Sequence, residues 1–192
     1  DTMQSVIGYA QDSPGSLKDF GIAYREIAMT AGGDVDFTAL KNAIHDKTKV
    51  ALIQRSRGYS LRNPLPISQI TAICEYIKKI KPDCICFVDN CYGEFVDSLE
   101  PTAAGADIMA GSLIKNPGGG LAATGGYIAG RSDLVEMAAY RLTAPGIGSE
   151  VGSSIGGNRL LYQGLFMAPH TTAQAVKGAI FAAAFFSLLG YT

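Results

Sequence analysis

Residues 84–95 read CICFVDNCYGEF, and the class of fold follows from this stretch and the segments around it. Residues 84–88 are all apolar, which is typical of a β-strand covered on both faces. Polar residues begin abruptly at Asp89. Upstream, Pro66 opens a segment whose apolar residues recur every three or four positions, as in an amphipathic helix. A buried strand that follows such a helix indicates an α/β protein.

The rest of the chain extends this pattern. Further strands are expected at residues 49–54, 107–114 and 126–129. Helices are expected after Asp36 and Ser132, which can cap them, and through an Ala-rich region up to residue 192. Strands that alternate with helices predict an α/β fold with a mostly parallel sheet.

Composition narrows the class of protein. With 192 residues, 47% of them hydrophobic, the chain can bury one sizeable core and is expected to form one domain. The 16 basic and 17 acidic residues nearly cancel, so neither nucleic acid nor an anionic membrane is expected as a partner. The most apolar segment, residues 178–191, is too short to span a bilayer and suits a buried helix.

The cysteines Cys74, Cys84, Cys86 and Cys91 crowd into one stretch. A disulfide framework would be spread more evenly, so a reducing compartment, the cytoplasm, is expected. The C-x-C-x4-C spacing could be read as a metal site, but paired C-x2-C ligands are missing. Cys84 and Cys86 are more simply buried strand residues, and no metal is expected.

Two polar clusters follow predicted strands, at residues 89–95 and 112–120. Ligands of open α/β sheets bind at the carboxyl ends of strands. Lys115 stands there beside glycines that permit close approach, as a Schiff-base amine requires, and Asp89 could pair with a pyridinium nitrogen. Taken singly, Lys115 could be a surface lysine, Asp89 a turn residue and Tyr92 a core tyrosine.

The Asp-x-x-Tyr motif at residues 89–92 and the Ser-x-x-Lys-Asn motif at residues 112–116 resemble motifs of the fold-type-I pyridoxal-phosphate (PLP) enzymes, the aspartate-aminotransferase superfamily. More closely, essentially the whole chain is similar to the methionine γ-lyase-like group of cystathionine β-lyase or "aluminium resistance" proteins. The motifs that carry this are QRSRGY (54–59), FVDNCYGEF (87–95), GSLIKNPGGG (111–120) and YRLTAPGIG (140–148). The resemblance implies a three-layer α/β/α fold in which residues 1–192 form most of the large PLP-binding domain.

The same resemblance implies roles for five residues. Lys115 matches the lysine that holds PLP as a Schiff base and moves the Cα proton, and Asp89 matches the carboxylate on the pyridine nitrogen. Tyr92 matches the tyrosine at the ring's 3-oxygen, and Ser112 a phosphate-binding serine. Arg57 lies in the region where the superfamily places an Asn near the 3-oxygen.

The chain also departs from the superfamily. Ile114 precedes the lysine where cystathionine-type lyases usually carry Thr, and Ala123 stands where aminotransferases place a phosphate-binding Arg. The Gly-rich phosphate turn is expected in an N-terminal segment outside this chain. The arginine that binds the substrate carboxylate is expected in a C-terminal small domain, also outside it.

The resemblance therefore implies a PLP-dependent carbon–sulfur lyase that acts on a sulfur-containing amino acid by β- or γ-elimination, as a homodimer or homotetramer with shared active sites. An aminotransferase shares the early steps and is the alternative enzyme. A PLP-binding stress-response protein without turnover is the alternative from another class. The intact Lys115 and Asp89 argue against the latter, because a non-catalytic descendant could lose them.

Overall fold

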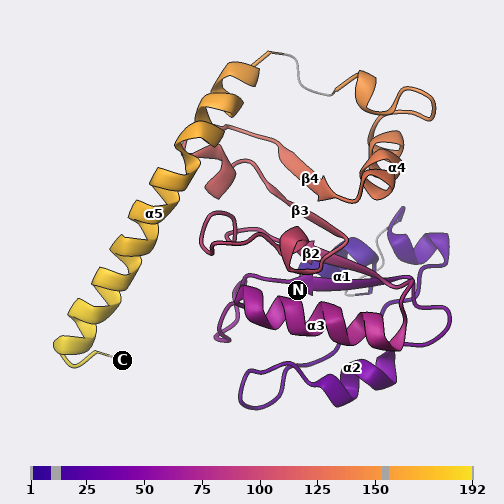
Figure 1. Ribbon diagram of the computed structural model, residues 1–192, viewed down its shortest axis with the longest axis horizontal. Coiled ribbons are helices and arrows are strands. Elements are labelled where there is room, and N and C mark those ends of the chain that lie inside the picture. Colours follow the sequence, from indigo (N-terminus) through magenta and orange to yellow (C-terminus); the bar gives the residue numbers. More distant parts are fainter. Residues whose placement is uncertain (1, 10–13, 153–155, 192) are drawn as a thin grey trace. The chain divides into compact units, whose positions relative to one another are not determined.

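The computed structural model describes residues 2–9, 14–152 and 156–191 (Figure 1). The chain divides into two compact units, Asp1–His45 and Asp46–Thr192. The first unit contains the helices α1 (Thr2–Ile7) and α2 (Phe37–Ala43) and the 3-10 turn η1 (Leu17–Phe20). Asp36 caps α2 as predicted, because its carboxylate accepts a hydrogen bond of 2.8 Å from the Ala39 backbone N–H.

A sheet organises the second unit. Its described strands lie in the order β1 (Val50–Gln54), β2 (Ile85–Asp89), β3 (Ile108–Ser112) and β4 (Gly126–Gly130). The first three are parallel, and β4 runs antiparallel to β3. The prediction of an α/β fold with a mostly parallel sheet is therefore confirmed.

Helix α3 (Ile67–Ile80) connects β1 to β2 and begins directly after Pro66, as predicted. Its apolar stripe is buried, and Cys74 lies against Cys86 of β2. Within β2, Cys86 and Val88 are fully buried, whereas Ile85 and Phe87 are only half-buried. The expectation of a strand covered on both faces is thus met on one face in this chain.

Helix α4 (Ser132–Leu142) follows β4, but Ser132 does not cap it. The capping position is Arg131, which has no side-chain capping bond. Arg131 is held instead by Asp107 before β3, whose backbone carbonyl and carboxylate accept hydrogen bonds of 2.9 and 3.2 Å. This anchorage starts the helix one residue earlier than the serine signal predicted.

Helix α5 (Asn158–Leu188) corrects a prediction. The segment 178–191 was expected to be buried, but Phe181 is 71% and Leu188 88% exposed. Only Gly164, Ala168 and Thr172 of α5 are buried, because the helix packs through its N-terminal half and then extends away from the sheet (Figure 1). Helix α5 is long enough and apolar enough to cross a membrane. Core helices of soluble proteins can also meet this criterion of length and composition.

The contact between α5 and the short turn η3 (Asn116–Gly118) is unusually close. A Cβ added at Gly164 would lie 2.2 Å from the Gly118 carbonyl oxygen, and one at Gly119 would lie 2.3 Å from the Gly164 carbonyl oxygen. Two backbone segments can pack so closely only where the residues at the contact have no side chain. Glycine at both positions therefore brings α5 against the loop that carries Lys115.

We expect Gly164→Ala to destabilise the full-length protein by about 1–3 kcal/mol, because its methyl group collides with backbone that cannot yield. Thermal or urea unfolding measures the change. Gly178→Ala in the same helix is the matched control, since nothing lies within 4 Å of its added Cβ. The control should leave stability unchanged or raise it by up to about 1 kcal/mol. Equal stability of the two variants would contradict the proposed close contact.

Candidate active site

The carboxyl edge of the parallel strands collects the predicted site residues. Gln54 at the end of β1 pairs with Asp89 at the end of β2, and Asp89 pairs with Ala110 of β3. Ser112 ends β3 at the same edge, and Lys115 follows in the next loop. Because parallel strands end at one edge, the loops that follow β1, β2 and β3 leave the sheet together.

Lys115 and Tyr92 lie in direct contact. The Lys115 Nζ is 4.0 Å from the centroid of the Tyr92 ring, within the range of a cation–π interaction. Tyr92 has a φ of 67°, in the left-handed region that a bulky residue rarely adopts. Such strain costs on the order of 1–3 kcal/mol and clusters at functional sites. The loop after β2 thus presents Tyr92 to Lys115 at an energetic cost.

Three of the predicted site residues, Asp89, Ser112 and Lys115, act on Cys91. Its backbone N–H donates a hydrogen bond of 3.1 Å to Asp89 Oδ1. Burial, together with a hydrogen bond between the thiol and Asp89, raises the pKa of Cys91, while nearby Lys115 acts in the opposite direction. The Ser112 backbone is also a hydrogen-bond partner of the thiol. Asp89 therefore lies against Cys91, and Lys115 is near enough to act on the charge of the thiol.

Arg57 lies in the loop after β1, on an exposed turn. Its backbone carbonyl accepts a hydrogen bond of 2.7 Å from the Ser60 hydroxyl, and its guanidinium has no hydrogen-bond partner among the described residues. The loop is shaped by Arg62, which donates to the Gln54 carbonyl at 2.9 Å and to the Ser56 carbonyl. The role of Arg57 stays a prediction.

A buried polar network underlies the loop after β2, and the sequence analysis missed it. Arg55 is only 3% exposed, and it donates to Asn90 Oδ1 at 2.8 Å and to the Gly93 carbonyl at 2.9 Å. Both of these bonds use Nη1, and the second terminal nitrogen, Nη2, pairs with the Asp97 carboxylate at 2.5 Å. Buried charges are stable only when paired and hydrogen-bonded. These bonds fix the loop that carries Tyr92.

The network continues toward the loop of Lys115. The Tyr127 hydroxyl of β4 donates to Glu94 Oε1 at 2.7 Å and accepts a bond from Asn90 Nδ2 at 3.2 Å. The Glu94 carbonyl accepts a bond of 2.9 Å from the side-chain amide of Asn116, the residue after Lys115. Burial raises the pKa of the Glu94 carboxyl, and burial together with Glu94 raises the pKa of Tyr127.

Parts of this network left a signal in the sequence. Arg55 directly follows an apolar strand, a position where a charge must be paired if the chain stays buried. The bond between Tyr127 and Glu94 left none, because 33 positions separate the two residues. Their meeting depends on the antiparallel pairing of β4 with β3.

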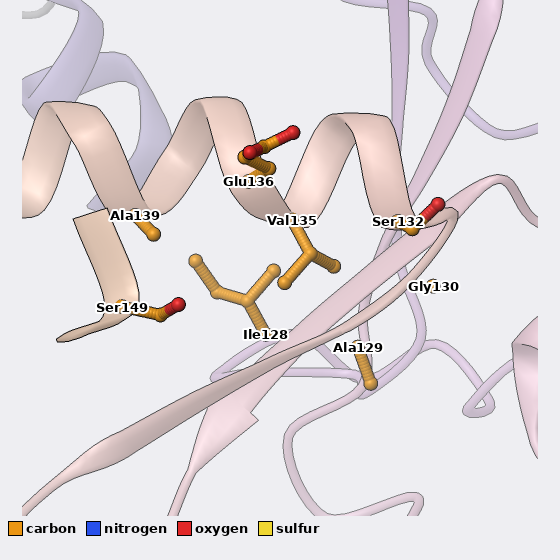
Figure 2. Close-up of a pocket in the computed structure, with 8 residues that line it drawn as sticks. All are labelled: Ile128, Ala129, Gly130, Ser132, Val135, Glu136, Ala139 and Ser149. Carbon is orange, nitrogen blue, oxygen red and sulfur yellow. The ribbon is translucent and has the colours of Figure 1, made fainter. Parts of the chain in front are cut away.

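A hollow of about 490 Å³ lies between β4 and α4, away from the predicted site residues. Figure 2 shows apolar side chains such as Ile128 and Val135 at its lining. None of the predicted site residues line it. The described residues contain no group of three or more His, Cys, Asp or Glu that could hold a metal ion, and all four cysteines are free.

Comparison with known proteins places the chain among lyase-like relatives. An uncharacterised protein of Bacillus subtilis, YnbB, is 50% identical over all of this chain and 46% of its own length. A Listeria monocytogenes structure provisionally named a cystathionine beta-lyase involved in aluminum resistance is 53% identical, with a TM-score of 0.96 over 99% of this chain and 47% of its own. A carbon-sulfur lyase involved in aluminum resistance from Clostridium novyi is 47% identical, with a TM-score of 0.94 over 100% and 46%.

A distant likeness concerns the fold alone. Cystathionine gamma-lyase from Lactobacillus plantarum is 21% identical, with a TM-score of 0.57 over 79% of this chain and 36% of its own. The chain spans about half the length of YnbB and of the Listeria and Clostridium proteins. The family model described as methionine gamma-lyase matches residues 1–192. The chain therefore belongs to the methionine gamma-lyase family.

Proposed function

We propose that the full-length protein is a PLP-dependent carbon–sulfur lyase, and that this chain supplies most of its large cofactor-binding domain. One observation carries the proposal: the Lys115 amine lies over the ring of Tyr92, which follows Asp89 in the loop at the carboxyl end of β2. Family membership and the name of the Clostridium relative support the lyase class. The proposed substrate is a sulfur-containing amino acid.

The chemistry of the available groups fits PLP. Lys115 offers an amine for the cofactor's aldehyde, and Asp89 a carboxylate for the protonated ring nitrogen. Tyr92 and Ser112 offer hydroxyl groups for the ring oxygen and the phosphate, and Arg57 a cation at the same edge. Lys115 and Ser112 are half-buried and Tyr92 is 59% exposed, so a bound group can reach all three.

Each residue would then have a defined task. PLP, when bound, supplies the electron-withdrawing ring that stabilises negative charge at the substrate's Cα. Lys115 would hold the cofactor through its amine, and the same amine, when free, would remove the Cα proton of the substrate. Asp89 would keep the proton on the ring nitrogen by accepting its hydrogen bond. Loss of the sulfur group from Cβ or Cγ would follow.

The rest of the protein would complete this site. We assign the phosphate turn and the substrate-carboxylate arginine to the half of the protein outside this chain, and part of the site to a neighbouring subunit in a homodimer or homotetramer. A second helical layer on the sheet would complete a three-layer large domain and cover the half-buried residues of β2. Four free thiols suit the cytoplasm, where they stay reduced.

An assay of the full-length protein with a panel of sulfur amino acids tests the function directly. A carbon–sulfur lyase releases a thiol and a 2-keto acid together. Transfer of the amino group to a keto-acid acceptor, without thiol release, would indicate an aminotransferase instead. Bound PLP without either reaction would favour the stress-response alternative.

We expect Lys115→Ala in the full-length protein to abolish covalent attachment of PLP, because no other amine is expected to occupy this position. The yellow absorbance of the bound cofactor should be missing, and the adduct trapped by borohydride reduction should be absent in mass spectra. Lys79→Ala, on the exposed side of α3, is the control and should keep both signals. A variant at position 115 that stays yellow and active would refute the assignment.

We expect Asp89→Asn to lower kcat far more than cofactor binding. Asparagine can still hydrogen-bond the ring nitrogen but cannot keep it protonated, so the ring becomes a poorer electron acceptor. A loss of about 2–3 kcal/mol corresponds to a decrease in kcat on the order of a hundredfold. Steady-state kinetics and a PLP titration measure the two effects, with Asp46→Asn in an exposed turn as the control. Normal turnover with a full complement of PLP would show that Asp89 is not the partner of the ring.

A further inference from the structure

Hydrogen bonds to Glu94 join the two loops of the candidate site and tie them to β4. The bonds run from Asn90 through the hydroxyl of Tyr127 to the side chain of Glu94, and from the Glu94 carbonyl to Asn116. Asn90 is the neighbour of Asp89, and Asn116 the neighbour of Lys115. The Glu94 backbone carbonyl thus links the loop of Asp89 to the loop of Lys115, and the Tyr127 hydroxyl anchors the Glu94 side chain to β4.

The surroundings of this link leave little freedom. A Cβ at Gly111 of β3 would lie 2.4 Å from Glu94 Oε1 and 2.7 Å from the Tyr127 oxygen. Glu94 itself is only 3% exposed. The close approach of β3 holds the acceptor and the donor against each other, so the bond cannot shift without moving the strand.

Glu94 is also kept at a cost. Its second carboxyl oxygen, Oε2, is buried and has no hydrogen-bond partner among the described residues. An unsatisfied buried polar group costs about 1–3 kcal/mol, and in a native structure it calls for an explanation. The charged or titratable groups that face Glu94 are Arg55, Glu100 and Tyr127. Burial raises the pKa of the Glu94 carboxyl more than the positive charge of Arg55 lowers it, so the neutral carboxyl is favoured.

We propose that Glu94 and Tyr127 are positioning residues, which hold the loop of Asp89 and Tyr92 in fixed register with the loop of Lys115. The identity of the group bound between the loops rests on the proposed function. The positioning concerns the protein's own residues and can be tested without any cofactor. A neutral side chain of the same shape should replace Glu94, since the bond requires only an acceptor for the Tyr127 hydroxyl.

The first test measures the reactivity of Lys115 in full-length protein from which PLP has been removed. Acetic anhydride labels lysines, and mass spectrometry gives the labelling rate of Lys115 relative to Lys79 in the same sample. Tyr127→Phe releases the Glu94 side chain from β4, so the loop that carries Tyr92 should shift. Lys115 should then lose its place over the Tyr92 ring, with a relative rate that rises about threefold or more. Glu94→Ala should behave in the same way, whereas Glu94→Gln should keep the wild-type ratio.

The second test uses the PLP-loaded enzyme. Tyr127→Phe should lower kcat about tenfold while KM stays within about a factor of two, and Glu94→Gln should stay near wild type. Tyr140→Phe is the matched control, because it removes a tyrosine hydroxyl that bonds Glu136 on the exposed face of α4. It should change neither the labelling ratio nor kcat.

The outcomes separate the two proposals. If Tyr127→Phe lowers only the melting temperature and leaves the Lys115 labelling ratio unchanged, the positioning role is overturned. If Glu94→Gln changes the Lys115 labelling ratio as much as Glu94→Ala does, the claim that Glu94 acts only as a neutral hydrogen-bond acceptor is overturned. If the labelling ratio changes as expected but wild-type protein binds no PLP, the positioning role stands and the proposed function fails.

Discussion

The burial of the Arg55 guanidinium is the constraint on which the candidate site depends. A buried cation must be paired and fully hydrogen-bonded, or its desolvation would cost several kcal/mol. Arg55 meets this demand by binding Asn90, Gly93 and Asp97, all in the loop after β2. Gly93 leaves room for it, since a Cβ there would lie 2.4 Å from the Arg55 nitrogen. The loop is therefore shaped around Arg55, and this shape presents Tyr92 to Lys115.

The second loop is held by different means. Backbone contact at Gly118, Gly119 and Gly164 seats the turn after Lys115 against α5, and the Asn116 side chain ties it to Glu94. Both loops are thus held by contacts with other elements as well as by their own turns. Rigid support from strands and helices is what a reactive constellation requires, because small displacements of reacting groups lower rates strongly.

Sequence patterns predicted the fold well where the physics is local. Apolar runs predicted the four strands of the part of the chain that the structure describes. Pro66 and Asp36 predicted helix starts, and the alternation of strands with helices predicted the parallel sheet. The failures have a common cause. Ser132 lost its capping role to the pairing of Arg131 with Asp107, and the apolar end of α5 is exposed rather than buried. Both outcomes depend on contacts with segments distant in sequence, or on the absence of such contacts within this chain.

The order of apolar and polar residues along the chain was enough to predict which residues stand at strand ends, and hence that Asp89, Ser112 and Lys115 leave the sheet at one edge. The sequence also determined the family, because long motifs recur in the same order along the whole chain. The contact of the Lys115 amine with the Tyr92 ring and the bond between Glu94 and Tyr127 depend on how distant segments fold together. Hydrogen bonds between residues more than 30 positions apart are set by strand register and by the cost of burying polar groups, and neither can be read from local spacing.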